Sequence, residues 1–187
     1  MVLTNSFLES AINEPLCLRP YDPAWPRKYA KEKARLLAIF AGDILQLEHI
    51  GSTAVPGLAA KPIIDMLAGV QSMEDADALL APLRDYGYVT PPDCNLGLVD
   101  RRWLLRHASA RRTHHLHLVV LGGYGWRRTL RFRDLLCAHA EAAKQYEELK
   151  LRLVQVAGSD RTGYALAKTE FVQDLLDRYP ESRDGRV

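Results

Sequence analysis

The sequence predicts an α+β fold, in which a mixed β-sheet is covered by packed helices and followed by a helical C-terminal part. Two observations lead to this prediction. Segments with strand-like character, at 43–50, 61–70 and 113–121, all precede residue 122. Segments with helical periodicity, at 127–157 and 163–179, occupy the rest of the chain. Strands that come before helices, rather than alternating with them, are typical of α+β domains.

Glycine, proline and serine mark the ends of the elements in the first half of the chain. The expected elements are a helix at 27–41, strands at 43–50 and 61–70, and a helix from about Ser72 to Tyr86. Pro26 stands where a first-turn proline is favoured, and Gly42 and Gly87 follow the two helices as stop signals. Ser72, followed by Asp75, is a helix-start signal.

The second half contains one strong strand and three helical stretches. The expected elements are a short strand at 88–90, a strand at 96–107, a turn at Arg111-Arg112, a strand at 113–121 and helices at 127–139, 141–157 and 163–179. We expect a single domain over residues 21–180, with an N-terminal leader at 1–20 and a flexible polar tail at 181–187.

The composition is that of a globular protein rather than a membrane or nucleic-acid-binding protein. The chain has 187 residues, 48% of them hydrophobic, and no apolar run of the ~20 residues that span a bilayer. A net charge of +2 does not indicate a nucleic-acid partner. The three cysteines (Cys17, Cys94 and Cys137) lack zinc-type spacing, and the N-terminus does not resemble a signal peptide. These features predict a cytoplasmic protein.

The stretch HIGSTAVPGLAAKPIIDML, residues 49–67, carries most of the functional information. Gly51 lets a backbone approach a ligand closely because it has no Cβ, and Ser52 offers a hydroxyl and an N–H to an anion. Asp65 lies in the strand that follows, where a carboxylate among apolar residues needs a partner or a metal. This pattern indicates a phosphate-bearing ligand; the alternative for Asp65 is a structural salt bridge, for instance with Lys61.

This stretch resembles the signature of the GrpB family, whose fold is similar to that of the nucleotidyltransferase superfamily. The superfamily pattern is Gly-Ser, a spacer and then acid–apolar–acid on a strand. Gly51-Ser52 and Asp65 match it, whereas Leu67 occupies the second acidic position and cannot bind a metal. Further GrpB-like elements extend the resemblance from about Tyr21 to Tyr179: His115-Leu116-His117, Phe132-Arg133-Asp134, Leu149-Lys150, Tyr164 and Lys168.

The resemblance implies a phosphate cradle at Gly51, Ser52 and Thr53, beside a metal-dependent centre. His115 and His117 share one face of their strand, so the expected metal ligands are Asp65 and His117, with His115 as a third. Such a mixed oxygen and nitrogen site would shift the preference from Mg²⁺ towards Mn²⁺ or Zn²⁺. The alternative is a pair of histidines hydrogen-bonded in a polar cleft without metal.

The expected site extends to side chains from several other elements. Lys61 or Arg102 would stabilise developing charge, with Asp65, His117 and Lys61 as the catalytic set. Either Glu48 or His49 would line the cleft, because they face opposite sides of their strand. The C-terminal helices would add cations and an aromatic ring to the ligand site: Arg133, Lys150, Tyr164 and Lys168.

Three functions are compatible with these residues. The first is metal-assisted transfer of a nucleotidyl group to a small acceptor. The second is a nucleotide- or coenzyme-binding module without catalysis, which the missing acid at Leu67 favours; GrpB-like segments are also found fused to dephospho-coenzyme A kinase. The third is another metal-dependent small-molecule enzyme that uses histidine in place of the acid. The sequence does not identify the substrate, the acceptor or the oligomeric state.

Overall fold

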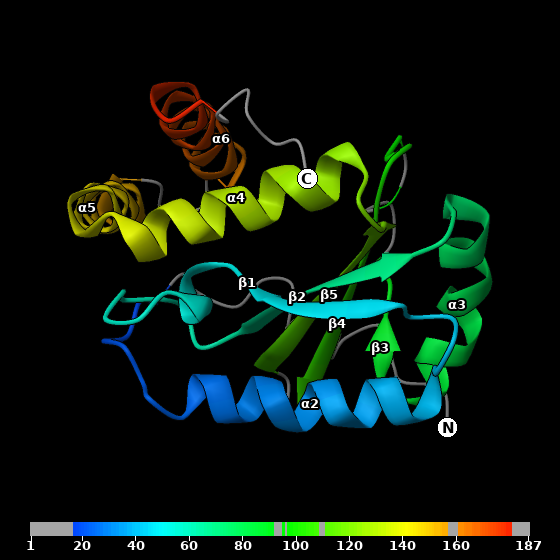
Figure 1. Cartoon of the computed structure of the whole chain (residues 1–187). Helices are drawn as coiled ribbons and strands as arrows, with labels where there is room; N and C mark the ends of the chain where they lie inside the picture. The colour runs from blue at the N-terminus through cyan, green and yellow to red at the C-terminus, as the bar shows by residue number, and fades with distance from the viewer. Residues whose placement is uncertain (1–16, 92–94, 96, 109–110, 157–160, 181–187) are drawn as a thin grey trace.

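The computed structural model describes residues 17–91, 95, 97–108, 111–155 and 167–180, and the backbone alone of residues 156 and 161–166. A five-stranded sheet lies at its centre, with the order β1-β2-β5-β4-β3 (Figure 1). The strands are β1 (Gln46–Ile50), β2 (Ile64–Val70), β3 (Tyr88–Val89), β4 (Arg102–Ala108) and β5 (Arg111–Val120). β2 and β5 run parallel and the other pairs antiparallel, so the sheet is mixed, as predicted.

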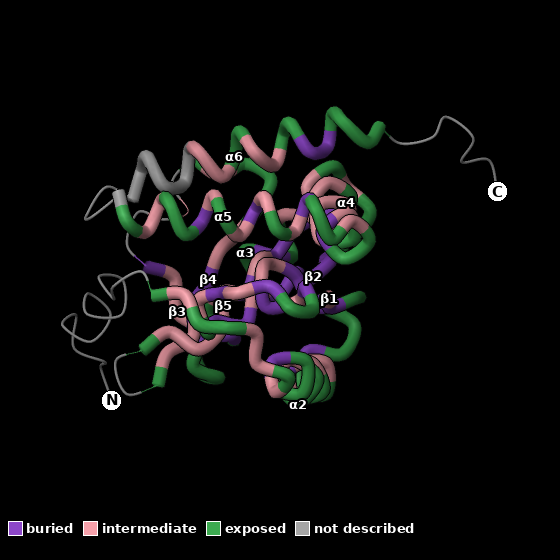
Figure 2. The backbone as a smooth tube through the Cα atoms, turned by 90° about the vertical axis from the view of Figure 1, so that its left-hand side faces the viewer, coloured by how far each residue is buried: buried purple, intermediate pink, exposed green. Residues whose placement is uncertain are grey.

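Helices cover both faces of the sheet. Helices α2 (Trp25–Ile39) and α3 (Met73–Asp85) pack on one face, and helices α4 (Tyr124–Ala138), α5 (Ala140–Val156) and α6 (Arg161–Arg178) form a bundle over the other (Figure 1). Figure 2 shows the buried residues concentrated in the strands and on the inner sides of the helices. The predicted α+β fold with a helical C-terminal part is therefore confirmed.

Strand alternation separates the two faces. The even-numbered residues of β2, such as Ile64 and Met66, join the main hydrophobic core beneath α2 and α3. The odd-numbered residues point to the α4–α6 side, where Leu67 packs with Ile50, Val119 and Trp126 in a smaller cluster. Asp65 lies on this second face, so the C-terminal helices cover the side of the sheet that carries the predicted site.

Several predicted boundaries differ from the observed ones. The first strand begins at Gln46 rather than residue 43, and the second at Ile64 rather than residue 61, since Pro62 cannot donate a ladder hydrogen bond. The strand predicted at 96–107 is β4, which covers Arg102–Ala108. The helix predicted at 127–139 is α4, which begins earlier, at Tyr124. The predicted helix start at Ser72 is correct: its hydroxyl accepts a hydrogen bond from the backbone N–H of Asp75 (3.1 Å).

The turn predicted at Arg111-Arg112 is wrong, because both residues belong to β5. The pairing of β4 with β5 shifts between Arg106 and His107, so that Arg106 faces His114 while His107 faces Arg112. This bulge places one extra residue, Thr113, on β5. Because of the extra residue, side chains of β5 before Thr113 point to the opposite face from the one that simple alternation gives. Arg112 therefore lies on the same face of the sheet as His115.

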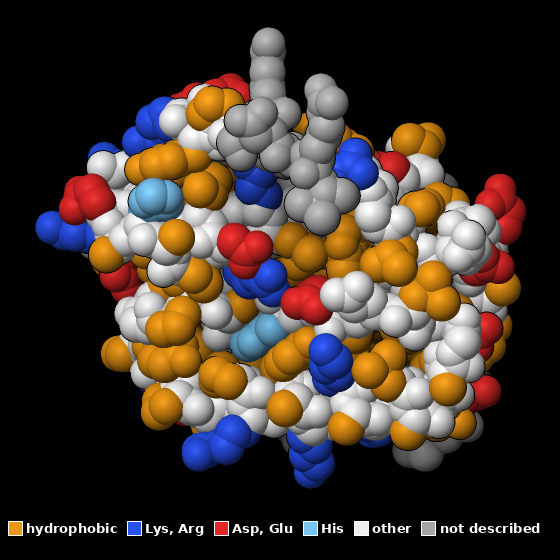
Figure 3. All heavy atoms as spheres, in the orientation of Figure 1, with side chains coloured by type: hydrophobic (Ala, Val, Ile, Leu, Met, Phe, Trp, Pro, Cys, Tyr) orange, Lys and Arg blue, Asp and Glu red, His pale blue; other side chains and the backbone are white. Residues whose placement is uncertain are grey.

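The molecular surface carries mixed charge on the face shown in Figure 3. Lys and Arg side chains alternate there with Asp and Glu side chains and with hydrophobic ones, so the described part of this face has no broad basic surface. Within the described part of the chain, no helix combines the length and apolar content needed to cross a membrane.

Candidate functional site

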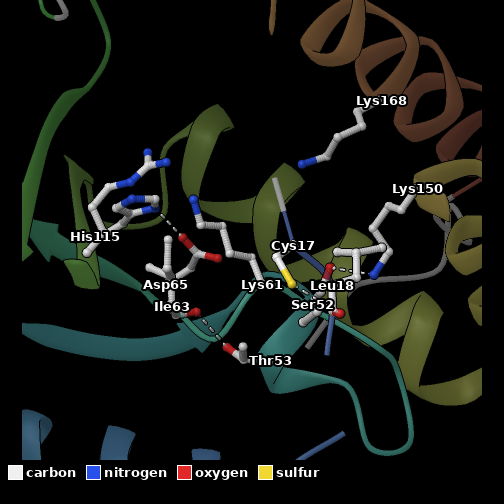
Figure 4. Close-up of a pocket in the computed structure, with 12 residues that line it drawn as sticks. Cys17, Leu18, Ser52, Thr53, Lys61, Ile63, Asp65, His115, Lys150 and Lys168 are labelled. Atoms are coloured by element: carbon white, nitrogen blue, oxygen red, sulfur yellow. Dashed lines mark hydrogen bonds and ion pairs between the residues drawn. The ribbon is translucent and has the colours of Figure 1, made fainter. Parts of the chain in front are cut away.

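A cavity of about 200 Å³ opens between the sheet and the C-terminal helices, at the point where β1 ends (Figure 4). The turn after β1 forms one wall, and β2 and β5 form the floor. Helices α5 and α6 each contribute one lysine from above. The lining residues are Cys17, Leu18, Ser52, Thr53, Ala60, Lys61, Ile63, Asp65, Arg112, His115, Lys150 and Lys168. The predicted Gly-Ser turn and Asp65 therefore meet at one site.

Gly51 brings the turn into contact with Asp65. Its backbone has φ 71° and ψ −175°, a conformation essentially restricted to glycine. A Cβ at this position would overlap the Asp65 carboxylate. Only glycine therefore allows β1 to pass directly into the short 3₁₀ turn at Ser52–Ala54 while Asp65 occupies the neighbouring strand.

Asp65 and His115 form a hydrogen-bonded pair on the cavity floor. The parallel register places them side by side on β2 and β5, and Asp65 Oδ1 lies 2.8 Å from His115 Nδ1. Burial favours the protonated carboxyl, but the hydrogen bond from His115 holds the pKa of Asp65 below its usual value. A carboxylate can only accept, so Nδ1 carries the proton. The buried Nε2 of His115 has no hydrogen-bond partner among the described residues.

Lys150 crosses from α5 to the Gly-Ser turn. Its ammonium donates to Ser52 Oγ (3.1 Å) and to the carbonyl of Ala59, and it lies 5.0 Å from the centre of the Tyr146 ring. Lys150 is only 2% exposed. Burial, assisted by repulsion from Lys168, lowers its pKa to about 8. Because Ser52 accepts from Lys150, its hydroxyl proton remains available to an anion.

Three further cations line the same cavity. Lys61 lies at the start of the segment leading into β2, and Lys168 reaches from α6 towards the centre of the cavity (Figure 4). Both were predicted. Arg112 was not assigned to the site, since simple alternation places it on the opposite face and no sequence signal marks the bulge. Cys17 and Leu18 were also missed; they reach the site because Arg19 pairs with Ala60 through two backbone hydrogen bonds (2.8 and 2.9 Å).

His49 and Thr53 support the turn instead of facing a ligand together. His49 lies on the α2 face, stacked on Tyr29 with ring centres 4.7 Å apart. Its Nε2 lies 3.0 Å from Thr53 Oγ1, which in turn donates to the carbonyl of Ile63 (3.3 Å). Burial lowers the pKa of His49 to about 4, so the ring is neutral. Of this predicted pair, Thr53 lines the cavity and His49 does not.

The two predicted arginines are placed away from the cavity. Arg102 faces α3, where it forms a bidentate contact with Asp77 (2.6 and 2.9 Å). Arg133 ties α4 to β1 by donating to Glu48 (3.1 Å) and to the carbonyl of His49 (2.9 Å). The Glu48 carboxylate is therefore engaged by Arg133. Tyr164 lies in α6, but its side chain falls outside the described part of the structure.

The predicted metal centre does not match the residues that the fold brings together. The register pairs Asp65 with His115, whereas His117 lies beside Leu67. No group of three or more His, Cys, Asp or Glu side chains close enough to hold a metal occurs among the described residues. Leu67 is 1% exposed and apolar, and Asp65 is accompanied by four cations and no second carboxylate among the described lining residues. This donor set does not suit the two-metal centre that the nucleotidyltransferase resemblance implies, and it suits an anion better.

Curated relatives match most of this chain but extend beyond it. The UPF0157 protein YqkA of Bacillus subtilis is 36% identical over 166 residues, which cover 89% of this chain and 48% of YqkA. A UPF0157 protein of Pseudomonas aeruginosa is 39% identical over 163 residues, covering 85% of this chain and 65% of the relative. The chain therefore spans about half to two thirds of the length of these relatives.

Two further comparisons concern a longer relative and a solved structure. A protein of Mycolicibacterium paratuberculosis named dephospho-CoA kinase is 33% identical over 187 residues, covering 88% of this chain and 46% of that protein. The crystal structure of the conserved protein GrpB from Enterococcus faecalis superposes with a TM-score of 0.74 at 33% identity, covering 87% of this chain and 99% of that one. The family described as GrpB protein matches residues 15–178. Because this match includes the sheet, the Gly-Ser turn and all three C-terminal helices, the chain is a member of the GrpB family.

Proposed function

We propose that this protein binds a phosphate-bearing small molecule of the nucleotide class, with the phosphates in the cavity at Ser52, Lys150 and Lys168. We further propose that the Asp65–His115 pair acts as a general base that helps transfer a phosphorus-containing group from this ligand to a small acceptor. The observation that carries the proposal is the charge of the cavity: among the described lining residues, four carry a cationic side chain and one a carboxylate.

The charge imbalance favours an anionic ligand over other ligand classes. Lys150 is buried and its pKa is lowered, so its charged form is disfavoured in the protein alone. A phosphate would offset the burial of Lys150 and accept several hydrogen bonds at once. Relatives named dephospho-CoA kinase contain a segment similar to this chain, which agrees with a ligand of coenzyme or nucleotide type.

The Asp65–His115 pair would supply the proton transfer. In the proposed step, an acceptor hydroxyl or water attacks phosphorus and gives its proton to His115 Nε2. The new phosphorus–oxygen bond replaces the bond to the leaving phosphate. The lysines stabilise the charge on the leaving oxygen, and Asp65 stabilises the imidazolium through Nδ1.

Calorimetric titration with inorganic pyrophosphate tests the binding site. Lys168→Gln should weaken binding by one charge-assisted hydrogen bond, about 1.5–3 kcal/mol or at least tenfold. Lys28→Gln is the matched control, because Lys28 pairs with Asp22 on the far face and is 55% exposed. Equal affinities for both variants, or the absence of pyrophosphate binding to the wild type, would contradict the site. A titration with chelator should give the same affinity, since the cavity cations bind the anion directly.

Turnover separates an enzyme from a binding module. Release of phosphate or pyrophosphate from ATP should fall about 10²–10⁴-fold in His115→Gln, while pyrophosphate affinity changes little. Asp65→Asn should lower the rate in the same way. If wild-type protein binds pyrophosphate but neither ATP nor any other nucleoside triphosphate turns over, the protein is a binding module. The apolar Leu67 at the second acidic position favours this second candidate.

A further inference from the structure

A second cavity, of about 340 Å³, adjoins the first, and the function proposed above does not use it. It lies between the same face of the sheet, the beginning of α4 and the middle of α6. Its lining residues are Ile50, Leu67, Asp100, Arg101, His117, Val119, Tyr124, Gly125, Arg128, Thr129, Thr169 and Gln173.

The two cavities are neighbours on three elements. On β2, Asp65 lines the first cavity and Leu67 the second, and on β5 His115 and His117 are divided in the same way. Lys168 and the adjacent residue of α6, Thr169, are likewise divided between them. Side chains two residues apart on a strand are about 7 Å from each other. This spacing is shorter than a nucleotide, so one molecule of that size is long enough to extend over both sets of lining residues.

The volumes of the two cavities also indicate that one ligand could occupy both. Sites for ligands of nucleotide size usually measure about 300–1,000 Å³, so the first cavity, at about 200 Å³, has room for the phosphates but not for the whole molecule. The rest of the ligand must extend beyond it. The second cavity supplies the missing volume on the same side of the sheet.

Part of the wall of the second cavity is apolar, and the other described lining residues are mostly polar or charged, among them Asp100, Arg101 and Arg128. Ile50, Leu67 and Val119 are at most 6% exposed and form an apolar surface. Beside them, the buried Nδ1 of His117 has no hydrogen-bond partner among the described residues. Burial lowers the pKa of His117 to about 3, so this ring is neutral at physiological pH. Tyr124, which is 70% exposed, places an aromatic ring at the rim.

These features select among the chemical groups that a phosphate-bearing ligand could carry. An alkyl chain would cover the apolar surface but leave His117 Nδ1 without a partner. A sugar would bond His117 but leave much of the apolar surface wet. A flat heteroaromatic ring covers the apolar surface with its faces and offers hydrogen-bonding atoms at its edge.

We propose that the second cavity holds the nucleobase of the ligand, with His117 bonding its edge, while the phosphates occupy the first cavity. This inference rests on the proposed function and names its substrate class more closely. It assigns to His117 the role of a base-binding residue instead of a metal ligand.

Calorimetric titrations of wild type and variants with ADP, UDP and inorganic pyrophosphate test the assignment. At least one nucleotide should bind wild type ten or more times as tightly as pyrophosphate. Gly125→Leu adds a side chain at the cavity wall, where its Cβ makes ordinary contacts with Val119 (3.8 Å) and Asp100 (3.9 Å). This variant should bind nucleotides no more tightly than pyrophosphate. Ala138→Leu, on an exposed part of the same helix, is the matched control.

A second variant covers the case in which Gly125→Leu fails to fold, as a lowered unfolding temperature would show. His117→Gln should weaken nucleotide binding about tenfold and leave pyrophosphate binding unchanged. Equal wild-type affinities for nucleotides and pyrophosphate would overturn the assignment, as would a nucleotide preference that survives in Gly125→Leu or His117→Gln. If pyrophosphate itself does not bind, the proposed function fails first and this inference with it.

Discussion

The two faces of the sheet handle buried charge in different ways. On the α2 face, the Glu32 carboxylate has a side chain only 6% exposed and is surrounded by donors. Arg35 and Arg106 each approach it to 2.9 Å, and the Tyr88 hydroxyl donates to it at 3.0 Å. Burial would raise the pKa of Glu32, but the arginines hold it below its usual value. This charge is balanced within the protein and joins α2 to β3 and β4.

On the α4–α6 face, the described residues bring together more cations than carboxylates. Lys150 is buried beside the Gly-Ser turn, and three more cations line the same cavity, where Asp65 is the one carboxylate among the described lining residues. A buried charge is costly unless something opposite balances it. The Glu32 cluster therefore balances its charge within the fold, whereas the proposed function assigns the cavity cations to an anion from outside. The two faces should therefore respond differently to the same kind of substitution.

The largest expected effect is on the balanced face. Glu32→Gln should lower the free energy of unfolding by about 3 kcal/mol, because it leaves Arg35 and Arg106 facing each other without their shared carboxylate. Urea denaturation measures this loss. Asp77→Asn is the control: it breaks a pair with Arg102 in which the Asp77 side chain is 51% exposed, and should cost less than about 1 kcal/mol.

The same variant should leave the other face unchanged. Pyrophosphate affinity of folded Glu32→Gln should equal that of wild type, since Glu32 lies across the sheet from the cavity. A loss of affinity without a loss of stability would reverse the roles assigned to the two faces.

Part of this comparison could be predicted from the sequence. Alternation in β2 and β5 correctly placed Asp65, His115 and His117 on one face. Alternation does not give the register between two strands, however. A shift of two residues would have paired Asp65 with His117, as predicted, instead of with His115.

The remaining errors come from long-range packing. Arg112 reaches the cavity through a bulge, which depends on the pairing of β4 with β5 and leaves no mark in β5 itself. Lys150 was predicted in the site from the resemblance alone, since its helix context is that of a solvated residue; its 2% exposure follows from the packing of α5 against the Gly-Ser turn. His49 is buried under α2 because its side of β1 faces that helix, and the sequence of β1 does not show which side faces the helix. These outcomes depend on how distant segments meet.

The difference between two glycine variants, about 1–3 kcal/mol, tests how tightly the cavity face is built. Gly51→Ala introduces an overlap with Asp65, whereas Gly57→Ala, also at positive φ (79°), has no atom within 4 Å of its Cβ. Gly57→Ala should cost about 1–2 kcal/mol for the backbone alone. Gly51→Ala should cost about 1–3 kcal/mol more from overpacking, and should also weaken pyrophosphate binding. Equal unfolding free energies for the two variants would show that the Gly51–Asp65 contact is relaxed at little cost.

The smallest expected effect is a pH dependence of anion binding on the cavity face. The free protein has a Lys150 pKa of about 8, and a bound anion would raise it, so binding above this pH requires proton uptake. Affinity should therefore be highest below pH 8 and fall about tenfold, or ~1.4 kcal/mol, between pH 7 and pH 9. Sulfate is a suitable probe, because it does not titrate in this range. In Lys150→Met, sulfate should bind more weakly and with an affinity that is nearly constant over the same range. If the wild type shows a flat profile, or if Lys150→Met keeps the tenfold fall, then Lys150 does not contact the anion and the excess charge of this face serves another purpose.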